Sequence, residues 1–186
     1  MRKLFALFAA SLLCATLAHA QTGRVCAPFD STFHYLQPGN LSVWIQGGVL
    51  TTNRSRNLTL HHSMAFNIHF VPVRYLQVGV HSSKRLPSND LSFWKSNETS
   101  LFARYTFLRM ACPEIGVFGQ GGYTKVTEVR KNNGGKTVDW YPYAGFGMYK
   151  DLGRHFSLQV ESQLYFNNRP NQASVSLVWK FMNCKF

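Results

Sequence analysis

Acidic residues and long apolar segments are both scarce in this sequence of 186 residues. Eight Asp and Glu residues oppose 20 Lys and Arg residues, so the formal net charge is +12, and only 15% of the residues are charged. That fraction is low for a coiled coil, and the ordinary numbers of Gly (14) and Pro (7) exclude a collagen-like repeat. Because 45% of the residues are hydrophobic and 15% aromatic, the chain is not a disordered one, and its length fits a single domain.

The N-terminal segment has the three parts of a secretory signal peptide. Arg2 and Lys3 are followed by an apolar run over residues 4–17 and by the small-residue cleavage pattern at residues 18–20. We therefore predict a signal peptide at residues 1–20, and the run is short for a retained spanning helix. After residue 20 no apolar run approaches the roughly 18 residues of a spanning helix. An exported chain of this kind is either soluble or a β-barrel, and without Arg2 and Lys3 its net charge is +10.

Hydrophobic residues recur with a period of two, which is the pattern of a β-strand with one apolar face. In residues 155–166, for example, Phe156, Leu158 and Val160 alternate with Ser157, Gln159 and Glu161. Eight segments of about ten residues show such a face, and ten residues is the length of a barrel strand that crosses a bilayer. These segments are residues 41–51, 64–70, 76–81, 101–107, 114–126, 138–149, 155–166 and 173–181.

The connections between these segments alternate in length. Short links at residues 71–73, 110–113 and 151–154 are interleaved with longer polar ones at 53–57, 84–97, 130–136 and 167–171. Outer-membrane barrels have short periplasmic turns and longer external loops. We therefore predict an all-β fold, an eight-stranded antiparallel up-and-down transmembrane β-barrel over residues 41–186. Residues 21–40 are then a periplasmic N-terminal tail.

A soluble lipocalin-like barrel is the alternative architecture, because its strands alternate in the same way but with the apolar face inward. Two features favour the apolar-out arrangement. The polar face carries too many Gln, Ser, His, Arg and Glu residues for a dry ligand cavity. Aromatic residues also gather near the strand ends, as they do at membrane interfaces. These aromatic residues are Phe70, Tyr75, Phe107, Trp140, Tyr149, Phe156, Phe166, Trp179 and Phe181.

Several Gly- and aromatic-rich stretches resemble those of a known group of proteins. They are residues 102–107 (FARYTF), 116–123 (GVFGQGGY), 143–149 (YAGFGMY) and the final strand up to Phe181. In these stretches the chain is similar to the small "porin family" or outer-membrane β-barrel domain proteins of Gram-negative bacteria, typical of Bacteroidetes. The resemblance spans nearly all of residues 41–182 and implies an architecture and an outer-membrane location rather than an activity.

Charged and polar side chains on the polar faces predict a network inside the barrel. Arg104 and Glu161 both fall near the middle of their strands, and charges in a narrow lumen must be paired and hydrogen-bonded. We expect these two residues to pair or to join a network that fills the lumen, with no cofactor. A gated pore or a proton path is the functional alternative. The other predicted members are Gln46, His69, Gln120, Gln159 and Gln163.

Basic residues concentrate in the longer connections, which we expect to face the outside. Such a surface would attract anionic groups, of which the phosphates of lipopolysaccharide are the nearest. The residues predicted to form this basic surface are Arg54, Arg56, Lys84, Arg85, Arg130, Lys131 and Lys136. We expect outer-membrane lipid, lipopolysaccharide and the barrel-insertion machinery as partners, no nucleic acid, and a monomer. The corresponding role is structural or lies in surface contact: membrane integrity, adhesion or contact with lipopolysaccharide.

A narrow passive channel and a lipid-A-modifying enzyme are the alternative functions. His81 and Ser83 share one face of a strand and could imitate a base and a nucleophile. No third, orienting carboxylate lies near them in the sequence, so we predict neither catalytic nor metal-binding residues.

Three cysteines remain after the predicted cleavage, and they allow at most one internal disulfide. All three map to the predicted periplasmic end, where disulfides form. Cys26 lies in the tail and can reach either other cysteine. We therefore predict that Cys26 pairs with Cys112 or with Cys184 and fixes the tail across the mouth of the barrel.

Overall fold

The computed structural model describes residues 34–54, 57–85, 93–110, 114–130, 135–153, 155–167 and 169–185. The predicted signal peptide and residues 21–33 of the predicted tail lie outside the described residues. A single 3-10 turn, η1 (His34–Leu36), precedes eight strands. The strands are β1 (Asn40–Arg54), β2 (Asn57–Val73), β3 (Leu76–Arg85), β4 (Phe93–Met110), β5 (Ile115–Arg130), β6 (Lys136–Asp151), β7 (Phe156–Tyr165) and β8 (Gln172–Lys185).

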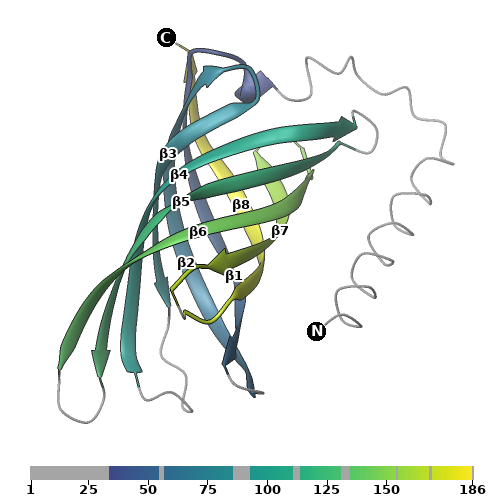
Figure 1. The fold of residues 1–186 in the computed structure, drawn as a ribbon. Coiled ribbons are helices and arrows are strands. Elements are labelled where there is room, and N and C mark those ends of the chain that lie inside the picture. Colours follow the sequence, from purple (N-terminus) through teal and green to yellow (C-terminus); the bar gives the residue numbers. More distant parts are fainter. Residues whose placement is uncertain are drawn as a thin grey trace, which may run out of the picture.

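The eight strands form one closed barrel in which every neighbour pair is antiparallel (Figure 1). Consecutive strands are adjacent all the way round, and β8 returns to pair with β1 from Asn40 opposite Lys185 to Thr52 opposite Gln172. Closure leaves no free sheet edge around the ring, which is the condition for crossing a bilayer with strands. The predicted eight-stranded up-and-down barrel is confirmed. Within the described ranges, no helix is both long and apolar enough to span a membrane.

The two ends of the barrel differ. At one end, the turn end, strands are joined across residues 74–75, 111–114 and 152–155; η1 and the last residues of β8 also lie at this end. At the other, the loop end, the connections are residues 55–56, 86–92, 131–135 and 166–171. Six of the eight strands are longer than the predicted ten residues. The longest are β4 with 18 and β2 with 17, whereas β3 and β7 have ten. Some of the extra residues come from segments that were predicted to be connections, such as residues 93–97 of β4. At the loop end β4, β5 and β6 extend beyond the end of β3 (Figure 1).

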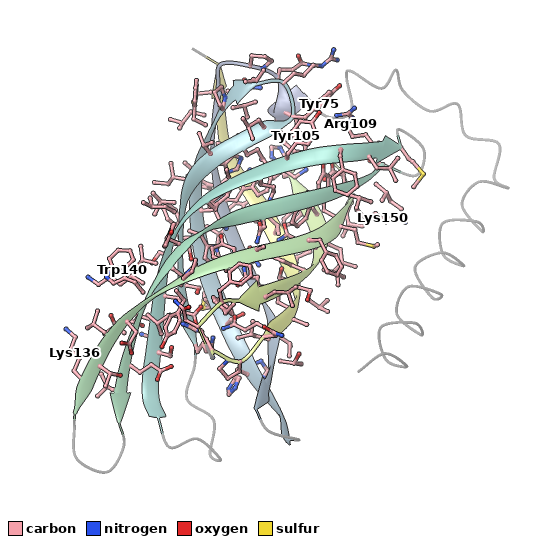
Figure 2. All side chains as sticks on the ribbon, viewed as in Figure 1. Tyr75, Tyr105, Arg109, Lys136, Trp140 and Lys150 are labelled. Carbon is pink, nitrogen blue, oxygen red and sulfur yellow. The ribbon has the colours of Figure 1, made fainter. Side chains whose placement is uncertain are left out.

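Apolar side chains form a belt on the outside of the barrel, and polar side chains fill the inside. On β7, Phe156 and Leu164 are exposed, whereas Ser157, Gln159 and Glu161 are buried. The same alternation holds along the neighbouring strand β8. The exposed Trp140 ring of β6 projects away from the barrel (Figure 2). Other exposed members of this outer belt are Phe66, Ile68, Phe70, Leu101, Tyr105, Phe107, Phe146, Leu177, Trp179 and Phe181. The apolar face therefore points outward, and the lipocalin-like alternative is wrong for this chain.

A small aromatic core lies inside the turn end. Tyr35 and Leu36 belong to the segment predicted to be a periplasmic tail, but they are buried there against Trp44, Phe118 and Tyr149. The leading segment is held by backbone hydrogen bonds: the nitrogen of Tyr75 donates to the oxygen of Leu36 at 3.0 Å.

Tyr149 was predicted in the outer aromatic set, and that prediction is wrong. Its position in β6 has inward parity, and it is only 5% exposed. Gly116 faces it from β5, and a Cβ at Gly116 would collide with the Tyr149 ring. The glycine therefore provides the space in which this ring packs.

Candidate functional site in the barrel lumen

Arg104 of β4 is the centre of the polar interior. It is 8% exposed, and its guanidinium donates through Nε to Oε1 of Gln120 at 2.9 Å and through Nη1 to Oε1 of Gln159 at 3.3 Å. Its Nη2 donates to Oε2 of Glu161 at 3.3 Å, which is also the ion pair. The guanidinium carbon lies 4.0 Å from the centre of the Phe118 ring, a cation–π contact on its other side. The charge of Arg104 is thus compensated on several sides in a site removed from water.

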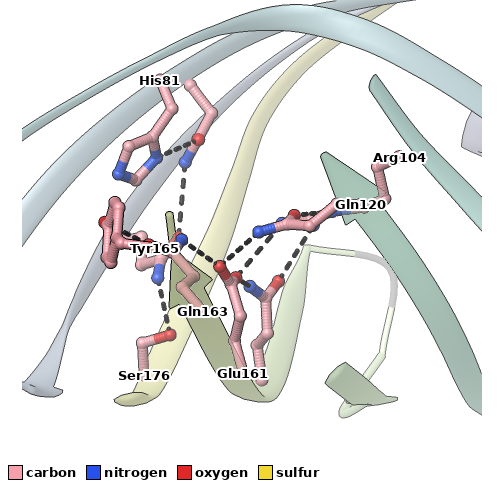
Figure 3. A network of polar contacts seen from close by, with 10 residues as sticks. His81, Arg104, Gln120, Glu161, Gln163, Tyr165 and Ser176 are labelled. Atoms are coloured by element: carbon pink, nitrogen blue, oxygen red, sulfur yellow. Dashed lines mark hydrogen bonds and ion pairs between the residues drawn. The ribbon is translucent and has the colours of Figure 1, made fainter. Parts of the chain in front are cut away.

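Glu161 of β7 accepts hydrogen bonds from several strands at once (Figure 3). Nε2 of Gln120 donates to its Oε1 at 2.5 Å, and Nε2 of Gln159 donates to its Oε2 at 2.7 Å. Gln163 also donates to Oε1, and Arg104 completes the set. Four donors from β4, β5 and β7 therefore surround one buried carboxylate, as a buried charge requires.

A second group of side chains lies beside this cluster, toward β1, β2 and β8. Nε2 of Gln46 donates to Oγ of Ser176 at 2.9 Å, and Asn67 donates to Oε1 of Gln46 at 3.4 Å. Nδ1 of His81 lies 2.6 Å from Oδ1 of Asn67. Together the two groups extend from one wall of the barrel to the other (Figure 3).

The structure brings most of the predicted lumen residues together. Arg104, Glu161, Gln120, Gln159 and Gln163 form direct contacts, whereas Gln46 reaches the second group only.

His69 lies apart from both groups. Its Nε2 is 2.8 Å from Nε2 of Gln77, and its ring meets the Trp44 ring edge-on at 4.4 Å. Asn67, Gln77, His81 and Ser176 were not predicted as members, although their inward parity was visible in the sequence.

A separate charged cluster, the mouth cluster, lies inside the loop end. Glu98 of β4 accepts hydrogen bonds at the same Oε1 atom from Nη2 of Arg85 and from Nη2 of Arg169. Arg169 also stacks on Tyr165, with its guanidinium carbon 4.6 Å from the ring centre, and the Tyr165 hydroxyl donates to Oε1 of Gln163 at 2.7 Å. The mouth cluster is therefore linked to the central network through one tyrosine.

The predicted basic outer surface is only partly seen. Lys84 and Lys136 are exposed. Arg85 was predicted on the outside, and that prediction is wrong: strand β3 continues with alternating parity from His81 to Arg85 and turns this guanidinium inward. The remaining four predicted residues are not placed. Arg56 and Lys131 lie outside the described residues, and the side chains of Arg54 and Arg130 are not described.

A further ion pair lies at the turn end. Nζ of Lys180 donates to Oδ1 of Asp151 at 2.6 Å, and the Ser157 hydroxyl donates to the same oxygen at 2.5 Å. The Tyr35 hydroxyl donates to Oδ2 at 2.8 Å. Burial raises the pKa of the Tyr35 hydroxyl, and Tyr149 and Asp151 raise it further, so Tyr35 keeps its proton and remains a donor. The leading segment is thus anchored by a charge-assisted hydrogen bond as well as by packing.

We expect Tyr35→Phe to lower the free energy of unfolding by about 1.5 kcal/mol, the low end of the range for a hydrogen bond to a charged group, because Asp151 keeps its other partners. Urea unfolding in detergent micelles measures this loss. Tyr123→Phe is the matched control, because its ring is 59% exposed on the outer surface. Equal effects of the two variants would contradict the anchoring role of the Tyr35 hydroxyl.

No group of three or more His, Cys, Asp or Glu side chains that could hold a metal ion occurs among the residues the structure describes.

The predicted disulfide is not tested. Cys26 and Cys112 lie outside the described residues, and Cys184 is half-buried in β8. The pairing of Cys26 stays a prediction.

No protein-family model matches the sequence, and no curated protein matches it either. Solved structures do match the fold. Neisserial surface protein A superposes with a TM-score of 0.58 at 12% identity, covering 80% of this chain and 99% of that one. The N-terminal β-barrel domain of OprF from Pseudomonas aeruginosa gives 0.53 at 13% identity, covering 79% and 98%. Both are outer-membrane β-barrels. The chain therefore has the fold of a small outer-membrane β-barrel. At these identities the likeness shows the fold alone.

Proposed function

We propose that this chain is an integral outer-membrane protein with a structural or surface-contact role (membrane integrity, adhesion or contact with lipopolysaccharide), and that its polar network closes the lumen. The observation that carries the proposal is the combination of an apolar outer belt with a hydrogen-bonded, charge-paired interior. Outer-membrane barrels have short periplasmic turns and longer external loops, so the turn end of this barrel would face the periplasm and the loop end would face outward. The resemblance to the small barrels typical of Bacteroidetes agrees with the proposal and stays a prediction.

Membrane fractionation combined with gel mobility tests the location. The protein should sediment with the outer membrane and should run faster unboiled than boiled, because a folded barrel resists the detergent. Recovery in the soluble periplasmic fraction would overturn the proposal.

Contact with lipopolysaccharide is supported by exposed cations at the loop end. Lys84 and Lys136 are exposed there. Lys136 and the exposed Trp140 ring both lie toward this end of the barrel (Figure 2), and Nζ of Lys125 lies 5.7 Å from the centre of the Trp140 ring. A ring at the membrane interface with cations beside it suits an anionic headgroup. A monomer that uses the barrel-insertion machinery follows from the same proposal. A lipid-modifying activity has less support, because Ser83 faces the lumen with His81 rather than the lipid.

We predict little or no steady conductance for the purified protein in planar bilayers. Arg104 and Glu161 sit at the centre of a hydrogen-bonded network inside the barrel, and we expect these paired charges and the glutamine side chains to occlude the bore. Single-channel recording checks this. Reproducible steps in the nanosiemens range would overturn the closed lumen. Small steps that appear only in Arg104→Ala or Glu161→Ala would show that the network is what closes it.

A further inference from the structure

The mouth cluster carries more positive than negative charge in a place with little water. The Arg85 and Arg169 side chains are 13% and 6% exposed, and the Glu98 side chain between them is 6% exposed. Two guanidiniums share one carboxylate oxygen, so one unit of positive charge is left over. Glu161, the next acid toward the centre, is already paired with Arg104. A buried charge is stable only when it is paired, so this surplus favours a second anion.

Two donor atoms of the cluster have no hydrogen-bond partner among the described residues. They are Nε of Arg85 and Nη1 of Arg169, and both are buried. Gln172 lies against the same pair, and with its amide oxygen turned toward them it accepts from Nη2 of Arg169 at 3.1 Å and from Nη2 of Arg85. The Gln172 amide thus already accepts from the two guanidiniums. The N–H groups at Nε of Arg85 and Nη1 of Arg169 still lack an acceptor among the described residues, and guanidinium N–H groups match the planar geometry of an oxyanion.

A polar hollow adjoins the cluster inside the barrel. Arg85, Glu98 and Gln172 form part of its wall. Hydroxyl and amide side chains make up much of the rest, including Ser100 and Ser174. Such a wall suits a small hydrated or hydroxylated group and does not suit a lipid tail.

We propose that the mouth cluster is a binding site for an oxyanion, a phosphate or carboxylate group, held by Arg85 and Arg169 in partial exchange with Glu98. The group comes either from a free small anion or from a lipopolysaccharide headgroup beside the loop end. Only the second source rests on the proposed membrane location. In this site Glu98 competes with the ligand for the two guanidiniums. Removing the Glu98 charge should therefore strengthen ligand binding, which a purely structural ion pair would not do.

The test uses full-length folded protein, labelled with 15N at arginine, in phosphatidylcholine nanodiscs. Inorganic phosphate is titrated at constant ionic strength against sodium chloride, and the Nε–Hε resonances of Arg85 and Arg169 are followed. We expect saturable shifts at both. Arg169→Gln should weaken the affinity about tenfold, the value of one charge-assisted hydrogen bond. Glu98→Gln should strengthen it by a similar factor, because it removes the competing carboxylate.

The control is Arg74→Gln, which removes the same charge from the exposed turn between β2 and β3, at the opposite end of the barrel. It should change the affinity less than about twofold, as a screened surface charge does. Unboiled gel mobility confirms folding, and Arg169→Lys replaces Arg169→Gln if the latter does not fold. Shifts that do not saturate, an equal loss in Arg74→Gln, or weaker binding in Glu98→Gln would each overturn the proposal.

A second arm identifies the source of the oxyanion. In nanodiscs that contain lipopolysaccharide and no phosphate, resonances already at their bound positions would assign the site to the headgroup. Spectra identical to those in phosphatidylcholine, together with saturation by phosphate, would assign it to a free anion.

Discussion

Leu177→Arg should lower the free energy of unfolding in bilayers by about 2–4 kcal/mol, because a charge near the midplane on the lipid face destabilises a barrel by this amount. Leu177 lies midway along the outward-facing row of β8 and is 48% exposed. It pairs with Gly47 on one side and Leu158 on the other, so no polar side chain is at hand to receive the guanidinium. Urea unfolding in phosphatidylcholine vesicles measures the loss.

Thr99→Arg is the matched control. Thr99 is also exposed on the outside of the barrel, but it lies one outward position beyond Leu101, where the apolar belt gives way to polar residues toward the loop end. Near an interface the penalty falls to about 0–1 kcal/mol. A neutral effect of Leu177→Arg, or an equal cost at both positions, would mean that the apolar belt does not face lipid.

Much of this fold was predictable because side-chain parity is a local property. Alternation placed Glu161 and Arg104 inside and Phe156 outside, and antiparallel neighbours then followed from short connections. Strand length was less predictable. Charged residues such as Arg85 and Glu98 look like loop residues, yet a strand that projects beyond the membrane can carry charge on both faces. Extending the parity of β3 and β4 would have placed both residues in the lumen.

The contacts inside the lumen could not be predicted from parity. Alternation alone predicts that an Arg substitution destabilises the barrel less at Gln159 than at Leu158 or Val160, because Gln159 faces inward. In the structure Gln159 bridges Arg104 and Glu161, so a guanidinium there would add a buried charge beside an existing one. Which inward residues touch across the bore depends on the stagger of all eight strands, and no local pattern in the sequence fixes that stagger.

Glu161→Gln should be the most destabilising neutral substitution in the lumen, at about 3–5 kcal/mol, because it leaves a buried cation without its counter-charge. The amide also presents donors to the glutamines that now donate to the carboxylate. Urea unfolding in vesicles measures the loss.

Adding Arg104→Met to Glu161→Gln should restore at least about 2 kcal/mol, because the double variant has no unpaired charge at the centre, and contacting residues couple by about this amount. The loss and its recovery follow from the geometry of one pair, since Arg104 has one ion-pair partner among the described residues. Lys180→Met in the Glu161→Gln background is the matched control. It removes the same charge from the buried pair at the turn end and isolates Asp151, so it should deepen the loss. Rescue by both second substitutions would indicate that excess positive charge in general, rather than the Arg104–Glu161 pair, sets the stability of the interior.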